Sequence, residues 1–294
     1  MTQWNMIIDV GKCGDCNNCF LACKDEYLDN DFPPHSAAQP RHGHRWINIM
    51  RKERGAFPMV DVAYLPMPCM QCDDARCVAA ARNGAAYKRS DGIVIIDPIK
   101  AKGQRELVDA CPYGAVWWNP ERGLPQKCSF CVHLLEEGWK EPRCVQACPT
   151  GAMRVLRAEA GEMQRIAEAE GLRVLGPEHG TRPRVYYKDL DRYDRCFVAG
   201  SVAVEIDGVT NCLEGAKVTL TRASEKLAEA STDSFGDFKF DGLEQASGRY
   251  SVRIEHPNCE TRTVEVDLET SVSIGTLWLA GAALPESPIL RTES

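Results

Sequence analysis

The sequence predicts two domains: an α+β domain organised around cysteine loops and a C-terminal all-β sandwich. Three observations support this division. Twelve of the 15 cysteines lie between Cys13 and Cys148. Beyond about Phe197, short stretches of alternating apolar and polar residues follow one another with turn residues between them. The charge balance also changes, since residues 201–294 carry 8 Lys+Arg against 16 Asp+Glu, whereas the rest of the chain is close to neutral.

The overall composition narrows the class of protein. With 294 residues, 44% apolar and 26% charged, the chain can bury a core, which excludes disordered and low-complexity proteins. No basic stripe indicates a nucleic-acid partner. The longest uncharged tract near the C-terminus, residues 271–285, is shorter than the ~18 residues of a membrane span, so we expect no direct membrane insertion. No secretion signal is visible, which predicts a cytoplasmic, reducing location where cysteines bind metal.

The first cysteine motif, Cys13-x2-Cys16-x2-Cys19-x3-Cys23, has the spacing of bacterial ferredoxins, with Lys24 where proline is usual. In this motif three thiolates bind one iron–sulfur cubane and the fourth binds the other cluster of a pair. The spacing limits which cluster each sulfur can reach. The two-residue gaps let three sulfurs bind one face of the same cluster, whereas the fourth cysteine, at the start of the next helix, points toward the neighbouring cluster.

The last motif, Cys128-x2-Cys131-x12-Cys144-x3-Cys148-Pro149, is the same pattern with an insertion. Crossing the fourth cysteines of the two motifs predicts two complete [4Fe–4S] sites. Site 1 contains Cys13, Cys16, Cys19 and Cys148, and site 2 contains Cys23, Cys128, Cys131 and Cys144.

The middle motifs are incomplete until they are crossed in the same way. Cys69-x2-Cys72-x4-Cys77 lacks a fourth cysteine, and Cys111 lacks the three that should precede it. Crossing leaves one intact set, site 3, made of Cys69, Cys72, Cys77 and Cys111. The ligand positions of a fourth site are occupied by Ala81, Ala101, Gln104 and Leu107, which we expect to fill that place by packing. All twelve cysteines are then used, which predicts three [4Fe–4S] clusters.

Other uses of the cysteines are less consistent with the spacing. Zinc prefers separate four-ligand sites and would leave a surplus thiol in the first motif. A disulfide framework is disfavoured without a secretion signal. We expect Cys196, Cys212 and Cys259 to be small buried or idle thiols, with a Cys212–Cys259 bridge as the alternative.

Catalytic motifs are not apparent. The sequence has no Gly-x-Gly-x-x-Gly, phosphate loop or Gly-x-Ser-x-Gly, and no nucleophile, acid or base stands out. The polar run from Arg41 to Trp46 is either a solvated loop or a contact to a partner subunit or a cluster. His133 is either a donor to a cluster sulfur or a surface residue. We therefore expect no catalytic residue and no activity from the chain alone.

Residues 1–155 are predicted to form a ferredoxin-like core with insertions. Short strands are expected at residues 6–9, 92–97 and 115–118, around the cysteine loops. A helix over residues 162–170, ended by Gly171, and an extended segment at 183–187 form a connector, residues 156–196, that packs on the core.

Residues 197–281 are predicted to form an immunoglobulin- or transthyretin-like β-sandwich. The alternating segments lie at residues 201–206, 216–220, 237–240, 250–254, 264–268 and 272–274. Such a module docks or stabilises a partner, or is passive. Residues 282–294 are expected to be a C-terminal tail.

The cysteine layout, with Cys-Pro-Tyr-Gly from Cys111 and Cys-Pro-Thr-Gly from Cys148, resembles the iron–sulfur subunits of molybdopterin oxidoreductases of the DMSO reductase family. The resemblance covers roughly residues 5–190. A narrower resemblance is to small subunits of the pyrogallol–phloroglucinol transhydroxylase and resorcinol hydroxylase type. It rests on the missing fourth site, the β-sandwich and the segments 16–19, 41–46 and 183–188.

This resemblance implies a non-catalytic electron-transfer subunit with three [4Fe–4S] clusters. Its partner would be a large subunit that binds molybdenum or tungsten as a bis-molybdopterin guanine dinucleotide complex and hydroxylates a phenol. Two alternatives stay open: a relay between a quinone-linked membrane anchor and a reductase, and a zinc-binding scaffold.

Overall fold

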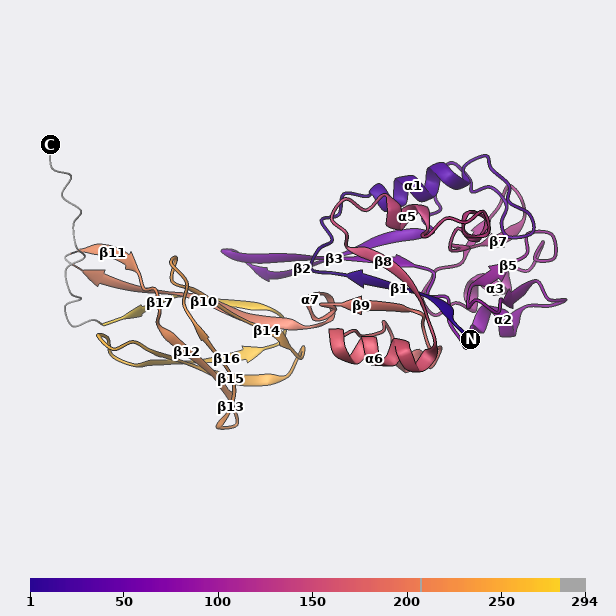
Figure 1. Cartoon of the computed structure of the whole chain (residues 1–294). Coiled ribbons are helices and arrows are strands. Elements are labelled where there is room, and N and C mark those ends of the chain that lie inside the picture. The colour runs from indigo at the N-terminus through magenta and orange to yellow at the C-terminus, as the bar shows by residue number, and fades with distance from the viewer. Residues whose placement is uncertain (207, 281–294) are drawn as a thin grey trace. The chain divides into compact units, whose positions relative to one another are not determined.

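The computed structural model describes residues 1–206 and 208–280, which form two compact units (Figure 1). The first unit contains residues 1–52 and 63–193, and the second contains residues 53–62 and the chain from Asp194 onward. The predicted boundaries at residues 155 and 196 stay a prediction, and the tail at 282–294 lies outside the described residues. None of the helices in the described ranges has both the length and the apolar character needed to cross a bilayer.

A three-stranded sheet organises the first unit. Strand β1 (Gln3–Asp9) lies between β8 (Met153–Ala158), to which it is antiparallel, and β9 (Val185–Lys188), to which it is parallel. Side chains alternate along β1, so that Met6 and Ile8 enter the main core while Ile7 packs in a smaller cluster with Met163. Met163 belongs to α6 (Ala160–Glu170), which ends where Gly171 adopts a left-handed cap. The sheet therefore has the cysteine-rich core on one face and α6 on the other.

Short helices and hairpins surround this sheet and hold the cysteine loops (Figure 1). The helices are α1 (Asn18–Tyr27), α2 (Arg76–Ala80), α3 (Glu106–Asp109), α4 (Val132–Glu136), α5 (Arg143–Gln146), η1 (Pro177–His179) and α7 (Asp191–Asp194). The hairpins are β2 (Ile47–Ala56) with β3 (Met59–Pro68), β4 (Ala86–Lys88) with β5 (Val94–Ile96), and β6 (Trp117–Asn119) with β7 (Leu124–Gln126). Strands β5 and β6 overlap the predicted strands at 92–97 and 115–118.

The second unit contains two four-stranded sheets that enclose an apolar core. In one, β10 (Cys196–Ile206) pairs with β11 (Val209–Cys212), β14 (Asp237–Leu243) and β17 (Val272–Leu279). In the other, the order is β13 (Glu225–Ser231), β12 (Lys217–Arg222), β15 (Gly248–Glu255) and β16 (Arg262–Leu268). All six predicted strands are present, and the alternation that predicted them places their apolar residues in one core.

The tip of the β2–β3 hairpin belongs to the second unit because of a buried arginine. The Arg54 side chain is only 1% exposed and donates a 2.8 Å hydrogen bond to Asp241, together with an ion pair to Asp61. Its guanidinium also lies over the Phe197 ring, 5.3 Å from the ring centre. The sequence did not predict this hairpin, because a buried arginine interrupts the apolar alternation that indicates a strand.

Candidate metal centres

The three Cys-x2-Cys pairs at Cys13, Cys69 and Cys128 share one backbone feature. In each, the residue directly before the second cysteine has a left-handed backbone: Asp15 (φ 55), Gln71 (φ 49) and Phe130 (φ 59). Non-glycine residues seldom adopt this conformation. It turns the chain sharply within a two-residue gap, so both sulfurs of a pair can reach one place.

The four cysteines of site 1 line a single cavity. Cys13, Cys16, Cys19 and Cys148 lie around it together with apolar atoms from Ile49, Pro66 and Met153. No charged residue is among the described residues that line it. Cys16 is exposed and Cys19 is buried, so this cavity lies close to the surface. The Thr150 hydroxyl lies 3.6 Å from the Cys148 sulfur.

The four cysteines of site 3 also line one cavity. It is formed by Cys69, Cys72, Cys77 and Cys111, with Met70, Val94 and Val116 as apolar walls. The lining also includes polar side chains, those of Tyr113, Thr181, the exposed Arg76 and the buried Lys127. The Ala115 amide donates a hydrogen bond to the Cys111 sulfur over 3.4 Å.

The cysteines of site 2 are grouped in the interior. Burial raises the pKa of the Cys144 thiol well above its usual range, and the nearby sulfurs of Cys131, Cys128 and Cys23 raise it further. The Gln39 amide approaches the Cys23 sulfur at 3.7 Å, and the Phe130 amide donates to the Cys128 sulfur at 3.3 Å.

Paired helices explain how neighbouring cysteines enter different sites. Helix α1 packs against α5, and α2 packs against α3. Cys19 and Cys23, one turn apart on α1, belong to the groups of sites 1 and 2 respectively. Cys144 of α5 joins site 2, and Cys148, two residues beyond the end of α5, joins site 1. Each helix of the α1–α5 pair therefore supplies one sulfur to each of two sites.

The chemistry of these groups fits iron–sulfur clusters. Burial raises the pKa of Cys19 to about 12, of Cys77 to about 11 and of Cys131 to about 11, and neighbouring cysteines add to the effect at Cys19 and Cys77. Four buried thiolates repel one another, so they need a positively charged centre to remain ionised together. Soft thiolate ligands favour soft metal centres, and iron–sulfur clusters are among these. The residues present thus suit such a group.

The positions that lack cysteines are filled by side chains. Ala101 and Leu107 are buried, and Ala81 packs against them with Val116. Gln104 is 4% exposed, accepts a 2.9 Å hydrogen bond from the Arg82 amide and donates to the Lys100 carbonyl over 2.8 Å. These contacts satisfy the only polar group among the four positions.

Leu107→Ala should destabilise the first unit without removing iron. Leu107 is fully buried, and shortening a buried leucine to alanine costs roughly 2–5 kcal/mol, from lost transfer energy and the cavity that remains. Denaturant unfolding, together with the iron content of the folded protein, measures both effects. Val108→Ala, at a partly buried neighbour, is the control for a smaller loss. A loss of iron from folded Leu107→Ala protein would contradict the assignment of this place to packing.

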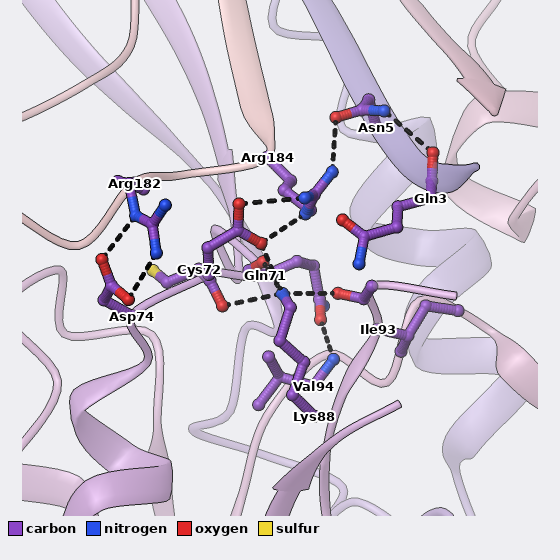
Figure 2. A network of polar contacts seen from close by, with 12 residues as sticks. Gln3, Asn5, Gln71, Cys72, Asp74, Lys88, Ile93, Val94, Arg182 and Arg184 are labelled. Carbon is purple, nitrogen blue, oxygen red and sulfur yellow. Dashed lines mark hydrogen bonds and ion pairs between the residues drawn. The ribbon is translucent and has the colours of Figure 1, made fainter. Parts of the chain in front are cut away.

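A network of charged side chains holds the loop that contains Cys69 and Cys72 (Figure 2). Lys88 donates hydrogen bonds to the carbonyls of Gln71 (3.2 Å) and Cys72 (2.9 Å), and forms an ion pair with Asp73. Arg184 binds both oxygens of the same Asp73 carboxylate, at 2.6 and 2.9 Å. Burial by itself would raise the pKa of Asp73, but hydrogen bonds from Arg184 and Lys88 bring it below its ordinary value. The loop is therefore fixed to β4 through Lys88 and to the residue before β9, Arg184.

Gln71 connects the loops of two sites. Its amide nitrogen donates to the Cys128 carbonyl over 3.1 Å, and its amide oxygen accepts from the Val94 amide over 2.8 Å. Figure 2 shows Gln71 and Val94 directed at each other beside Lys88. A glutamine between two ligand cysteines is easily overlooked in a sequence, because its partners lie in other segments.

The polar run at Arg41–Trp46 is only partly a solvated loop. Arg41 and His42 are exposed, but His44 and Trp46 are buried. The His44 ring bonds the Trp118 carbonyl at 2.9 Å, and the Arg45 guanidinium lies 4.0 Å from the centre of the Phe20 ring. The interpretation of this run as a solvated loop was therefore wrong for its second half.

His133 and the three remaining cysteines have local roles. His133 is buried, stacks on Phe32 and lies 2.9 Å from a Glu26 oxygen. It is thus not the surface residue of one interpretation. Cys196 is buried, Cys212 is exposed and Cys259 is partly buried, and all three are free thiols, so the Cys212–Cys259 bridge is not formed. Within residues 1–206 and 208–280, no group of three or more His, Cys, Asp or Glu side chains is arranged for a single metal ion.

Comparison with known proteins decides the family. The chain is 47% identical over 283 residues to the pyrogallol hydroxytransferase small subunit of Pelobacter acidigallici, covering 95% of this chain and 100% of that protein. This chain belongs to the family of pyrogallol hydroxytransferase small subunits. A 4Fe-4S dicluster domain model matches residues 60–158, and a carboxypeptidase regulatory-like domain model matches residues 198–275.

More distant relatives match the cysteine-rich part. A tetrathionate reductase subunit of Salmonella typhimurium is 34% identical, over 64% of this chain and 73% of that protein. The arsenate respiratory reductase iron-sulfur subunit of Shewanella sp. is 29% identical, over 62% of this chain and 94% of that protein. The iron–sulfur domain and the C-terminal all-β domain predicted from sequence are confirmed.

Proposed function

We propose that this chain is the electron-transfer subunit of a molybdopterin-dependent enzyme that hydroxylates or transhydroxylates a polyhydroxylated benzene such as pyrogallol or resorcinol. The family relationship carries the proposal, because a relative of almost the same length is named as the small subunit of a pyrogallol hydroxytransferase. The cysteine-rich unit supports it, and no catalytic constellation is needed here if the reaction takes place on a large partner subunit that binds molybdenum or tungsten as bis-molybdopterin guanine dinucleotide.

Three [4Fe–4S] clusters belong to this proposal. They would be held by Cys13, Cys16, Cys19 and Cys148 at site 1, by Cys23, Cys128, Cys131 and Cys144 at site 2, and by Cys69, Cys72, Cys77 and Cys111 at site 3. The support is that two of these sets each line one cavity and that the third is a mutually coupled group of buried sulfurs. The two helix pairs are also what a ferredoxin-like double-cluster core with insertions requires.

The chain's own residues would determine the order of the clusters and form the walls around them. When bound, the clusters supply one-electron transfer, which is cofactor chemistry. Cys144 of site 2 is electrostatically coupled to Cys19 of site 1, and Cys128 of site 2 to Cys69 of site 3. In this proposal, site 2 would lie between the other two. Apolar side chains form much of the walls of sites 1 and 3.

The test is anaerobic purification of this chain with its native partner. We expect about twelve iron atoms and about twelve acid-labile sulfides per chain, and turnover of a polyhydroxylated benzene by the complex but not by this chain alone. Zinc in place of iron, or full activity of the isolated chain, would contradict the proposal. The same preparation identifies the large subunit.

A further inference from the structure

Lys127 is a buried cation that touches site 3 and adjoins site 2. It is 4% exposed, and its side chain lines the cavity formed by Cys69, Cys72, Cys77 and Cys111. It directly precedes Cys128 of site 2. Burying a lysine is unusual, because an ammonium loses its hydration and needs compensation from the protein.

The partners of Lys127 are all acceptors. Its Nζ donates to the Val94 carbonyl and to the Cys128 carbonyl over 3.0 Å. An ammonium has three N–H donors and no acceptor, so these two carbonyls use two of its protons and leave one for the sulfurs of the cavity that its side chain lines. This arrangement therefore suits the charged form of the side chain.

No carboxylate neutralises this charge within the described part of the chain. Two other cations of the same unit, the partly buried Lys88 and the buried Arg184, both pair with Asp73. Lys127 forms no such pair, and the groups that act electrostatically on it are the sulfurs of Cys69, Cys77 and Cys128. Its counter-charge must come from the thiolate sulfurs themselves, whose negative charges together outweigh the positive charge of the centre that they would bind.

We propose that Lys127 sets the reduction potential of site 3, and to a smaller degree that of site 2. The inference rests on the proposed function, since it requires clusters at these cysteines. A [4Fe–4S] centre with four thiolates has a net charge of about −2, and one added electron makes it about −3. A buried positive charge stabilises the more negative state, and the low local dielectric makes this stabilisation larger than it is in water. Lys127 thus raises the potential of site 3.

The experiment is a redox titration of the anaerobically purified complex, with dithionite as reductant and electron paramagnetic resonance as the readout. Lys127→Gln removes the charge but keeps an amide that can still donate hydrogen bonds. The signal of site 3 is identified as the one absent from Cys77→Ala. We expect the reduction equilibrium constant of site 3 to fall at least tenfold in Lys127→Gln, which is about 59 mV for a one-electron couple. Site 1 should not change.

Two further variants separate charge from other effects. Lys127→Arg keeps the charge and should restore most of the potential. Lys24→Gln is the matched control, because Lys24 also adjoins a ligand cysteine and bonds a carbonyl, that of Pro40 at 3.0 Å, but is partly exposed. Water screens such a charge, so its shift should be clearly smaller. Should Lys127→Gln fail to retain iron, Lys127→Met takes its place, since it fills similar volume without charge.

The outcomes distinguish the inference from the function on which it rests. If all three clusters are present by iron and sulfide content and site 3 keeps its potential in Lys127→Gln, the inference is wrong and the proposed function stands. An equal shift in Lys24→Gln would also overturn it. If the wild-type complex contains no [4Fe–4S] clusters, the proposed function itself fails.

Discussion

Replacing Cys77 or Cys111 with alanine is expected to remove one cluster of three and leave the others. Both residues line the cavity of site 3, and no cysteine of sites 1 or 2 lines it. Iron should fall from about twelve to about eight atoms per chain, and one reduced-state resonance should disappear. The C-terminal sandwich should keep its fold, because its core contains neither residue.

Cys196→Ala and Cys212→Ala provide the controls for this experiment. Cys196 is buried and Cys212 is exposed, and neither lines the cavities of sites 1 and 3 or joins the sulfurs of site 2. Both variants should retain all the iron. Complete loss of iron from folded Cys77→Ala or Cys111→Ala protein would show that the assignment of the twelve cysteines to three separate sites is wrong.

The second large effect is expected for Arg54→Met. This change leaves the carboxylates of Asp61 and Asp241 without their buried guanidinium, while Lys239 stays within 3.2 and 2.9 Å of them. Breaking a buried ion pair by removing one partner costs roughly 3–5 kcal/mol. Because Lys239 remains, we expect a loss near the lower limit, about 3 kcal/mol.

Hydrogen exchange on the complete chain measures the loss of stability locally, in the strands of the second unit that surround Arg54. Amides of β10 and β14 should exchange faster in Arg54→Met, while those of β1 should not change. Arg249→Met is the matched control, since Arg249 binds both oxygens of Asp267 but the two side chains are 69% and 61% exposed. Exposed pairs contribute only about 0–1 kcal/mol. An equally small effect in Arg54→Met would show that burial does not strengthen this interaction.

Regular patterns in the sequence were sufficient for much of the fold. Alternating residues predicted β10, β12, β14, β15, β16 and β17, because these strands contribute apolar side chains to one shared core. The helix ending at Gly171 was predicted from its apolar stripe and its stop residue. Strands β11 and β13 were missed because they bury little: all residues of β11 and β13 are exposed or partly exposed, so no apolar alternation marks them.

The grouping of the cysteines could be predicted from their spacing in the sequence, whereas the residues that surround each group could not. The gaps between cysteines limit which sulfurs can converge, and the sets inferred from them are the sets that line the two cavities. That these sets bind clusters stays a proposal. Lys127, Gln71 and the Asp73–Arg184 pair could not be recognised in the same way. Their partners lie up to 111 positions away, and no local pattern records such contacts.

The α2–α3 pair shows how a redox chain can be shortened without rebuilding the protein. In these two helices and the residues that follow them, positions one turn apart divide between site 3 and the place now occupied by Ala81 and Leu107. Apolar side chains at that place keep the two helices in contact. Cys77 and Cys111 can therefore line the same cavity although no cysteines stand at the neighbouring place. If the three cysteine sets bind clusters as proposed, a subunit built from such helix pairs can lose one cluster by a few substitutions and keep the others.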